Sequence, residues 1–328
     1  MMGEKVFAEG VAKDIKGYLP PDYADVECKV AEKRKNNGAV KVGLAFQKQG
    51  KLIPVFIFVE SFYQEICQGK PLDGVMEKIA GTAWEVMERN QFSNLSDIDN
   101  FEKIKDYLEV KIINTRANRK ELRGLVHQEK EDLSLLPVLK CPFPEQRACG
   151  NVKISNELME FWEVSADTVM DQAWENTRQN QPPTLRGLGE ILCYEIEGQS
   201  PEGDLFDEMN PMKERPGESA YILSNKSGVF GAVYLASTEV MEKISGLFPE
   251  GFYLLPSSVH EILVLPKYKG GPGQEKTLFE LGEMVREVNR TSVEREEILS
   301  DRIYEYDKER GKVRQVPESI KKERGMER

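Results

Sequence analysis

Ser258 and His260 are the pair of residues that first suggests chemistry, because a serine hydroxyl beside an imidazole can be activated as a nucleophile. Residues two apart in a strand point to the same face but stand about 6.6 Å apart along it, whereas a hydrogen bond between them needs roughly 3 Å. The G-x-S-x-G turn that presents a nucleophilic serine occurs nowhere in the chain. The spacing therefore argues against direct catalysis by this pair.

His260 and Glu261 also begin a zinc-protease motif, H-E-x-x-H, but Val264 stands where the second histidine is required. Strand alternation would place His260 on the same face as Ile262 and Val264, with Glu261 on the opposite face. This pattern predicts a half-buried, hydrogen-bonded histidine at the end of an apolar strand face. A ligand-contacting or catalytic role for His260 is the alternative.

A glycine-rich segment, residues 270–277, lies between a predicted strand and a predicted helix, as a phosphate-binding P-loop does. Glu275 occupies a position that a P-loop reserves for glycine, and a carboxylate there would repel phosphate. The segment is therefore predicted to be a flexible connection into a helix capped at Thr277. No nucleotide or other cofactor is expected.

Metal-ligating side chains are few and scattered, with five cysteines and two histidines in 328 residues. An odd, widely spaced set of cysteines fits reduced thiols better than a disulfide framework. The closest pair, Cys141 and Cys149, is separated by seven residues, whereas a zinc knuckle has two to four. No metal site is expected.

The composition argues against two classes of partner. Lys and Arg number 45 against 56 Asp and Glu, and no clustered basic stripe is present, so nucleic acid is not an expected partner. The longest apolar run, residues 52–59, is broken by Pro54 and is far shorter than the roughly 20 residues of a membrane span. Acidic residues near the N-terminus and the lack of an apolar stretch there argue against a secretory signal. These observations predict a cytoplasmic protein that does not bind membranes.

The N-terminal part shows the pattern of an α-β-β-β-α unit. Apolar residues at helical spacing predict a helix that ends before Pro20, and the hairpin signal Asn37-Gly38 lies between two strand-like runs. A third run follows, and residues 72–87 predict a long helix that covers the sheet.

The C-terminal half mixes strands with capped helices. Ser165 and Ser237 are each expected to cap a helix, because a serine side chain accepts from the free N–H groups of the first turn. Strands are predicted over residues 221–223, 231–235, 252–255 and 259–265. A helix over residues 277–289 should pack on the sheet that holds residues 259–265.

The predicted fold class is α+β, with two antiparallel β-sheets each covered by helices. The α-β-β-β-α unit is expected to form an N-terminal domain, residues 1–145. An α+β domain is expected over residues 146–316, followed by a charged flexible tail, residues 317–328.

Three segments carry a family resemblance: YLLPSSVHE at residues 253–261, MVREVN at 284–289 and EILSDRIYEYD at 297–307. With them the chain resembles an uncharacterised bacterial family of unknown function that is common in gut-dwelling Gram-positive anaerobes. The resemblance covers most of the chain, and residues 59–63 and 173–177 fit it as well. It implies a cytoplasmic bacterial protein with no established activity, so no catalytic residue is carried over.

The resemblance directs attention to polar clusters in these segments, which we expect to converge on one binding site. The candidate residues are Ser257, Ser258, His260, Glu261, Arg286, Asn289 and Asp301. Because every catalytic signature tested is absent, the leading hypothesis is a non-enzymatic binding or interaction protein with a protein or small-molecule partner. Some members of the family it resembles travel with mobile elements, so the resemblance implies a role as an accessory factor of a mobile element. The alternative is an intracellular hydrolase of unfamiliar type that uses His260 with Glu261 or Asp301.

Overall fold

The computed structural model describes residues 3–51, 54–89, 98–140, 151–191, 203–207, 220–267 and 278–317. The chain divides into two compact units, each assembled from several stretches of sequence. Unit 1 comprises Met1–Glu109, Gly124–Val126 and Pro137–Asn176. Unit 2 comprises Val110–Arg123, His127–Leu136 and Thr177–Arg328.

The predicted α+β class is confirmed, but the described residues form three antiparallel sheets, of three, four and six strands, where two were expected. The additional sheet is the four-stranded one, and its strands come from the middle of the chain, within residues 108–153. The expected domain boundary near residue 145 falls within residues 141–150, which lie outside the described residues, and stays a prediction. Of the expected tail, residues 318–328 also lie outside them.

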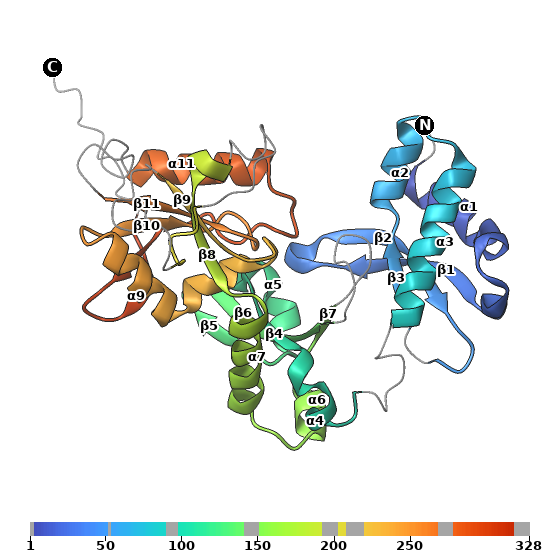
Figure 1. Ribbon diagram of the computed structural model, residues 1–328, viewed down its shortest axis with the longest axis horizontal. Coiled ribbons are helices and arrows are strands. Elements are labelled where there is room, and N and C mark those ends of the chain that lie inside the picture. Colours follow the sequence, from blue (N-terminus) through green and yellow to red (C-terminus); the bar gives the residue numbers. More distant parts are fainter. Residues whose placement is uncertain are drawn as a thin grey trace. The chain divides into compact units, whose positions relative to one another are not determined.

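Unit 1 contains the predicted three-stranded meander with helices packed against it (Figure 1). Asn37 and Gly38, with φ of 57° and 70°, form the turn between its first two strands, because these residues adopt left-handed backbone at little cost. The first helix buries Phe7 and Val11, as its spacing predicted. The elements are α1 (Glu4–Asp14), η1 (Ile15–Tyr18), η2 (Pro21–Tyr23), β1 (Glu27–Arg34), η3 (Asn36–Gly38), β2 (Val40–Gln47), β3 (Val55–Phe58), α2 (Glu60–Cys67), α3 (Leu72–Arg89), α4 (Phe101–Ile104), η5 (Lys105–Tyr107), β7 (Asn151–Lys153) and α6 (Asn156–Phe161).

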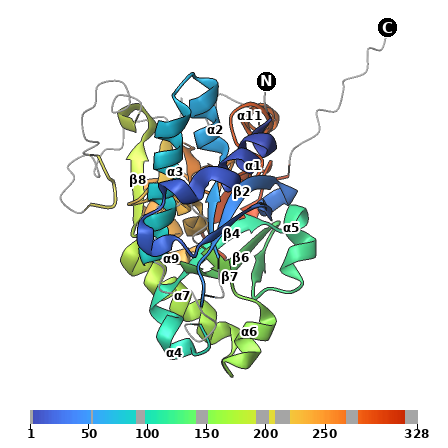
Figure 2. The same cartoon turned by 90° about the vertical axis from the view of Figure 1, so that its right-hand side faces the viewer.

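Three elements have residues in both units: β4 (Leu108–Asn114), β6 (Leu133–Lys140) and α7 (Ala166–Asn180). β6 lies between β4 and β5 (Gln128–Lys130) and also pairs with β7. Figure 2 shows β4, β6 and β7 side by side. It is buried along almost its whole length, which explains its nearly continuous apolar sequence. Ser165 caps α7 as predicted, because its Oγ accepts the N–H of Thr168 (3.1 Å).

Unit 2 is built on the six-stranded sheet, in the order β13-β12-β10-β11-β9-β8. Its strands are β8 (Pro183–Gly187), β9 (Tyr221–Asn225), β10 (Phe252–Leu255), β11 (Ile262–Pro266), β12 (Tyr304–Asp307) and β13 (Lys312–Gln315). Helix α11 (Leu278–Thr291) lies along one face and α9 (Thr238–Leu247) along the other (Figure 1). Leu281 and Val285 of α11 pack with Leu255 and Leu265, which confirms that this helix packs back on the sheet.

The strand expected over residues 231–235 is wrong, because this segment forms a 3₁₀ helix, η7 (Gly231–Ala236). All five residues are buried, and a short apolar run of this kind fits a buried helical turn as well as a strand. Phe230 enters η7 with φ 58°, and a Cβ on Gly231 would lie only 2.6 Å from the backbone nitrogen of Asn225 in β9. The close approach of η7 to β9 therefore depends on glycine.

Candidate functional site

A cavity of about 640 Å³ in unit 2 brings together two of the predicted site residues, Arg286 and Asp301. Its volume falls within the range of ligand-binding pockets. Its walls come from the start of α5 (Thr115–Leu122), the turn between β5 and β6, α11, the segment before β12 and β13. The lining residues are Asn114, Arg116, Ala117, Asp132, Arg286, Asp301, Arg302 and Gln315.

The start of α5 is fixed by Asn114, which caps the helix. Its Oδ1 accepts the N–H of Ala117 (2.9 Å), and its Nδ2 donates to the carbonyl of Leu299 (2.9 Å). Thr115, the first residue of the helix, donates its N–H to the carbonyl of Asp132 (2.8 Å). These bonds hold the helix start in place, and the next residue, Arg116, lines the cavity.

The carboxylate of Asp132 forms a fixed part of the cavity wall. Oδ2 accepts from the Ser300 hydroxyl (2.9 Å), and Oδ1 accepts from Gln315 Nε2 (2.8 Å) and from the Tyr304 hydroxyl. Burial raises the pKa of Tyr304, and the negative charge of Asp132 raises it further. Tyr304 therefore stays protonated at neutral pH and remains a donor to Asp132.

Asn289, a predicted site residue, lies buried beside this network. Its Nδ2 donates to the carbonyl of Ser300 (3.1 Å) and to Oδ1 of Asp301 (2.7 Å), while its Oδ1 has no hydrogen-bond partner within the described residues. Arg286 lies one turn earlier on α11, with Nη2 2.7 Å from Oε1 of Glu283. Asn289 thus ties the segment that carries Asp301 to the helix that carries Arg286.

The balance of charge in the cavity is positive. Three arginines, Arg116, Arg286 and Arg302, line it together with two aspartates, Asp132 and Asp301. Arg286 also pairs with Glu283, which lies outside the lining. A guanidinium group presents a planar fork of donors that matches carboxylate and phosphate oxygens. The cavity is therefore suited to an anion.

His260 does not line this cavity and is held by two contacts of its own. Nδ1 accepts the N–H of Phe230 (3.1 Å), and Nε2 lies 3.2 Å from Oε1 of Glu297. The side chain is 26% exposed, so the predicted half-buried, hydrogen-bonded histidine is confirmed. The strand expected from residue 259 is wrong at its start, because β11 begins at Ile262 and His260 lies in a bend before it.

The other predicted residues lie around this bend. Ser257 accepts the N–H of Leu299 at its carbonyl (2.9 Å), and the Oγ of Ser258 accepts the N–H of His260 (3.0 Å). Glu261 is exposed just before β11. Backbone pairing thus brings the segment of Ser257 beside residues 297–300, which lead directly into Asp301. A single site that contains all seven residues stays a prediction.

Sequence reasoning missed most of the cavity. Asn114, Arg116, Asp132, Arg302 and Gln315 were not predicted as site residues, although they line it with Arg286 and Asp301. A local signal existed at one position, because an asparagine that follows a strand and precedes a helix is a common cap. No pattern in the sequence joins that region to residues about 170 to 190 positions farther along.

Among the described residues, no group of three or more His, Cys, Asp or Glu side chains is placed to hold a metal ion. No helix in the described part of the chain is both long enough and apolar enough to cross a bilayer.

Comparison with known proteins gives one match. A family model with the description "Family of unknown function (DUF5688)" matches residues 4–308. No curated protein and no solved structure matches the chain.

Proposed function

Because the chain belongs to DUF5688, a family of unknown function, we propose a function from the geometry of unit 2: the protein binds a small anionic ligand in the 640 Å³ cavity. The observation that carries the proposal is the convergence of Arg116, Arg286 and Arg302 on this cavity. They come from three separate segments, and the hydrogen bonds of Asn114, Asp132 and Asn289 hold those segments together.

Binding, and not catalysis, is the function that these contacts support best. Both oxygens of Asp132 already accept hydrogen bonds, so this carboxylate serves as a wall that orients Ser300, Tyr304 and Gln315. A wall held in place by such hydrogen bonds reduces the entropy that a binding site loses when a ligand enters.

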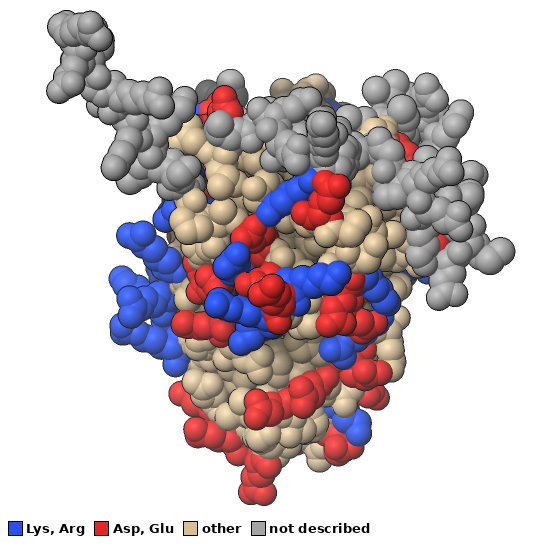
Figure 3. All heavy atoms as spheres, turned by 90° about the vertical axis from the view of Figure 1, so that its left-hand side faces the viewer, with Lys and Arg blue, Asp and Glu red and all other residues tan. Residues whose placement is uncertain are grey.

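The ligand class follows from the charges around the cavity. Across the middle of the face in Figure 3, Lys and Arg side chains are mixed with Asp and Glu. Ion pairs such as Arg314 with Glu305 (2.8 Å) and Lys267 with Glu305 (2.6 Å) pair basic with acidic side chains in this way on the sheet. A compact anion that fits among three arginines suits unit 2 better than a long polyanion, which needs an extended basic surface.

Further predictions belong to this proposal. Of the seven predicted site residues, Arg286 and Asp301 line the cavity and Asn289 supports it. Ser257, Ser258, His260 and Glu261 do not line this cavity, and their place in a binding site stays a separate prediction. A cytoplasmic location and a role as an accessory factor of a mobile element rest on sequence interpretation alone.

The proposal is tested by titrating the purified protein with citrate and with inorganic phosphate, each at constant ionic strength, by isothermal calorimetry. Arg286→Ala should weaken binding about tenfold or more, since it removes a charged donor. Arg290→Ala is the matched control, because Arg290 lies one turn along α11, pairs with Glu287 as Arg286 pairs with Glu283, and does not line the cavity. An equal loss of anion affinity in both variants, or no binding of either anion by the wild type at millimolar concentrations, would contradict the proposal.

The hydrolase alternative keeps one observation in its favour, the pairing of His260 with the carboxylate of Glu297. Our proposal predicts that His260→Ala lowers the free energy of unfolding by about 1–2 kcal/mol, because the N–H of Phe230 loses its acceptor, and leaves anion affinity unchanged. Mass spectrometry of co-purified small molecules should then give the same profile for wild type and variant. Loss of a specific small molecule in His260→Ala, with that molecule retained in Arg286→Ala, would move the site to His260.

A further inference from the structure

A second cavity in unit 2, of about 310 Å³, lies among η7, α9, β4, the β5–β6 turn and the β12–β13 hairpin. Its volume lies at the lower end of the range for small-molecule pockets. Much of its wall is apolar or aromatic, formed by Ile112, Leu133, Leu235, Met241, Tyr304 and Val313. An apolar wall of this kind offers a ligand burial of hydrocarbon surface.

Charged side chains also reach this cavity. Lys130 ends β5, Glu131 follows it in the turn between β5 and β6, and Lys312 begins β13. Nζ of Lys130 donates to the carbonyl of Ala236 (3.0 Å), another lining residue. Two ammonium groups against one carboxylate give a local excess of one positive charge.

The electrostatics at Lys130 agree with this arrangement. Desolvation lowers the pKa of its ammonium group, and repulsion from Lys312 lowers it further. An anionic group placed near both lysines would relieve that repulsion. The cavity thus combines an apolar interior with a site that favours one negative charge.

We propose that this second cavity binds an amphipathic monocarboxylate, with its hydrocarbon chain against Leu133, Leu235 and Met241 and its carboxylate near Lys130 and Lys312. The site is distinct from the arginine-lined cavity, which shares no lining residue with it. The ligand class also differs, because an apolar chain has no counterpart among the polar residues of the first cavity.

The first test uses sodium octanoate as the probe and 1-octanol as the uncharged comparison, measured by isothermal calorimetry on the full chain. Octanoate should bind, and 1-octanol should bind about tenfold more weakly or worse, because it lacks the charge. Lys312→Gln should weaken the binding of octanoate by about the same factor. Lys308 lies in the same hairpin but does not line the cavity, so Lys308→Gln should leave the affinity for octanoate unchanged.

A second pair of variants locates the binding. Thr238 is an exposed residue at the start of α9 that lines the cavity, so Thr238→Trp should block octanoate without disturbing the core. The adjacent exposed Glu239 does not line it, and Glu239→Trp should bind octanoate normally. Unaltered octanoate binding in Thr238→Trp, or none by the wild type, would overturn the proposal. Citrate binding in Thr238→Trp and octanoate binding in Arg286→Ala report on the two cavities separately, so either proposal can fail alone.

Discussion

Tyr304 is the residue on which the two cavities of unit 2 meet. It lines the smaller cavity, while its hydroxyl donates to Asp132, which lines the larger one. The same hydroxyl lies 3.0 Å from Ser300 Oγ. A buried phenol with these partners must keep its proton, because loss of the proton would place two negative charges side by side.

The raised pKa of Tyr304 predicts a loss of stability in alkali. In the unfolded chain a tyrosine loses its proton near pH 10, whereas folded Tyr304 retains it, so the stabilisation is present below pH 10 and falls as pH rises above it. One such proton corresponds to at most about 1.4 kcal/mol per pH unit. Urea unfolding of wild type and Tyr304→Phe at pH 7, 10 and 11 measures this dependence.

Tyr304→Phe should be less stable at pH 7 by about 1–2 kcal/mol, because Asp132 loses a donor, and should lose less stability between pH 10 and 11. Tyr253→Phe, on the neighbouring strand β10, is the control and should retain the steeper alkaline loss. Identical alkaline slopes in wild type and Tyr304→Phe would show that Tyr304 does not titrate differently on folding.

Sequence reasoning reached this site only in part. Arg286, Asn289 and Asp301 lie close in the sequence, within segments of the family resemblance. In the structure Asn289 bonds to Asp301, and Arg286 and Asp301 line the same cavity. Asp132 lies more than 150 residues before Ser300 and Tyr304, and nothing in its neighbours indicates those partners. Long-range pairing of single polar side chains leaves no periodic trace, so it cannot be derived from one sequence.

At the scale of elements, prediction succeeded where periodicity was long or a turn was specific. Helix α3 and the β1–β2 hairpin were predicted because eighteen helical residues and an Asn-Gly turn each give a clear signal. η7 was misassigned because a short buried apolar run has no period of its own. Helices α2 and α5, eight residues each, were not predicted for the same lack of length.

Gly43 in β2 provides a test of packing between strands in unit 1. A Cβ there would lie 2.6 Å from the carbonyl oxygen of Ile57 in β3 and would also meet the ring of Phe56. Gly43→Ala should therefore lower the free energy of unfolding by about 1–3 kcal/mol, through overpacking. Thermal unfolding followed by circular dichroism measures the change.

Gly81→Ala is the matched control for this substitution. Gly81 is exposed within α3, and an added Cβ would meet nothing within 4 Å. Because alanine favours the helix over glycine, this variant should gain about 0.5–1 kcal/mol. A Gly43→Ala protein as stable as wild type would show that β2 and β3 can separate without loss.

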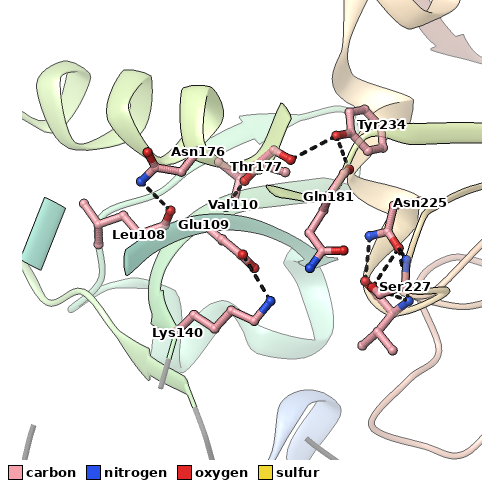
Figure 4. Close-up of polar contacts among 11 residues, drawn as sticks. Leu108, Glu109, Val110, Lys140, Asn176, Thr177, Gln181, Asn225, Ser227 and Tyr234 are labelled. Atoms are coloured by element: carbon pink, nitrogen blue, oxygen red, sulfur yellow. Dashed lines mark hydrogen bonds and ion pairs between the residues drawn. The ribbon is translucent and has the colours of Figure 1, made fainter. Parts of the chain in front are cut away.

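At the scale of the whole molecule, the chain passes between its two units several times, and polar contacts mark two of these passages (Figure 4). Asn176 bonds within unit 1, where its Nδ2 donates to the carbonyl of Leu108 (2.9 Å). The next residue, Thr177, bonds within unit 2, where its Oγ1 accepts the N–H of Val110 (2.9 Å). Adjacent residues thus belong to different units.

Because unit 2 is assembled from separate stretches of the chain, we expect a fragment to fold only if it contains all of them. Residues 146–316, the expected C-terminal domain, lack Ile112, Asp132 and Leu133, which contribute buried or hydrogen-bonded groups to unit 2. That fragment should show no cooperative thermal unfolding by circular dichroism, whereas residues 110–316, which supply them, should unfold cooperatively. Cooperative unfolding of residues 146–316 would instead support a folding boundary near residue 145.

The two-residue turn between β5 and β6 places neighbouring residues in the walls of different cavities. Glu131, with φ 56°, lines the smaller cavity, and Asp132 lines the larger one. A ligand that shifts this turn therefore changes the walls of both cavities. Thermodynamic reciprocity then requires that each ligand alters the affinity of the protein for the other by the same factor. Binding of one ligand would then be measurable as a changed affinity for the other, although the two ligands differ in chemistry.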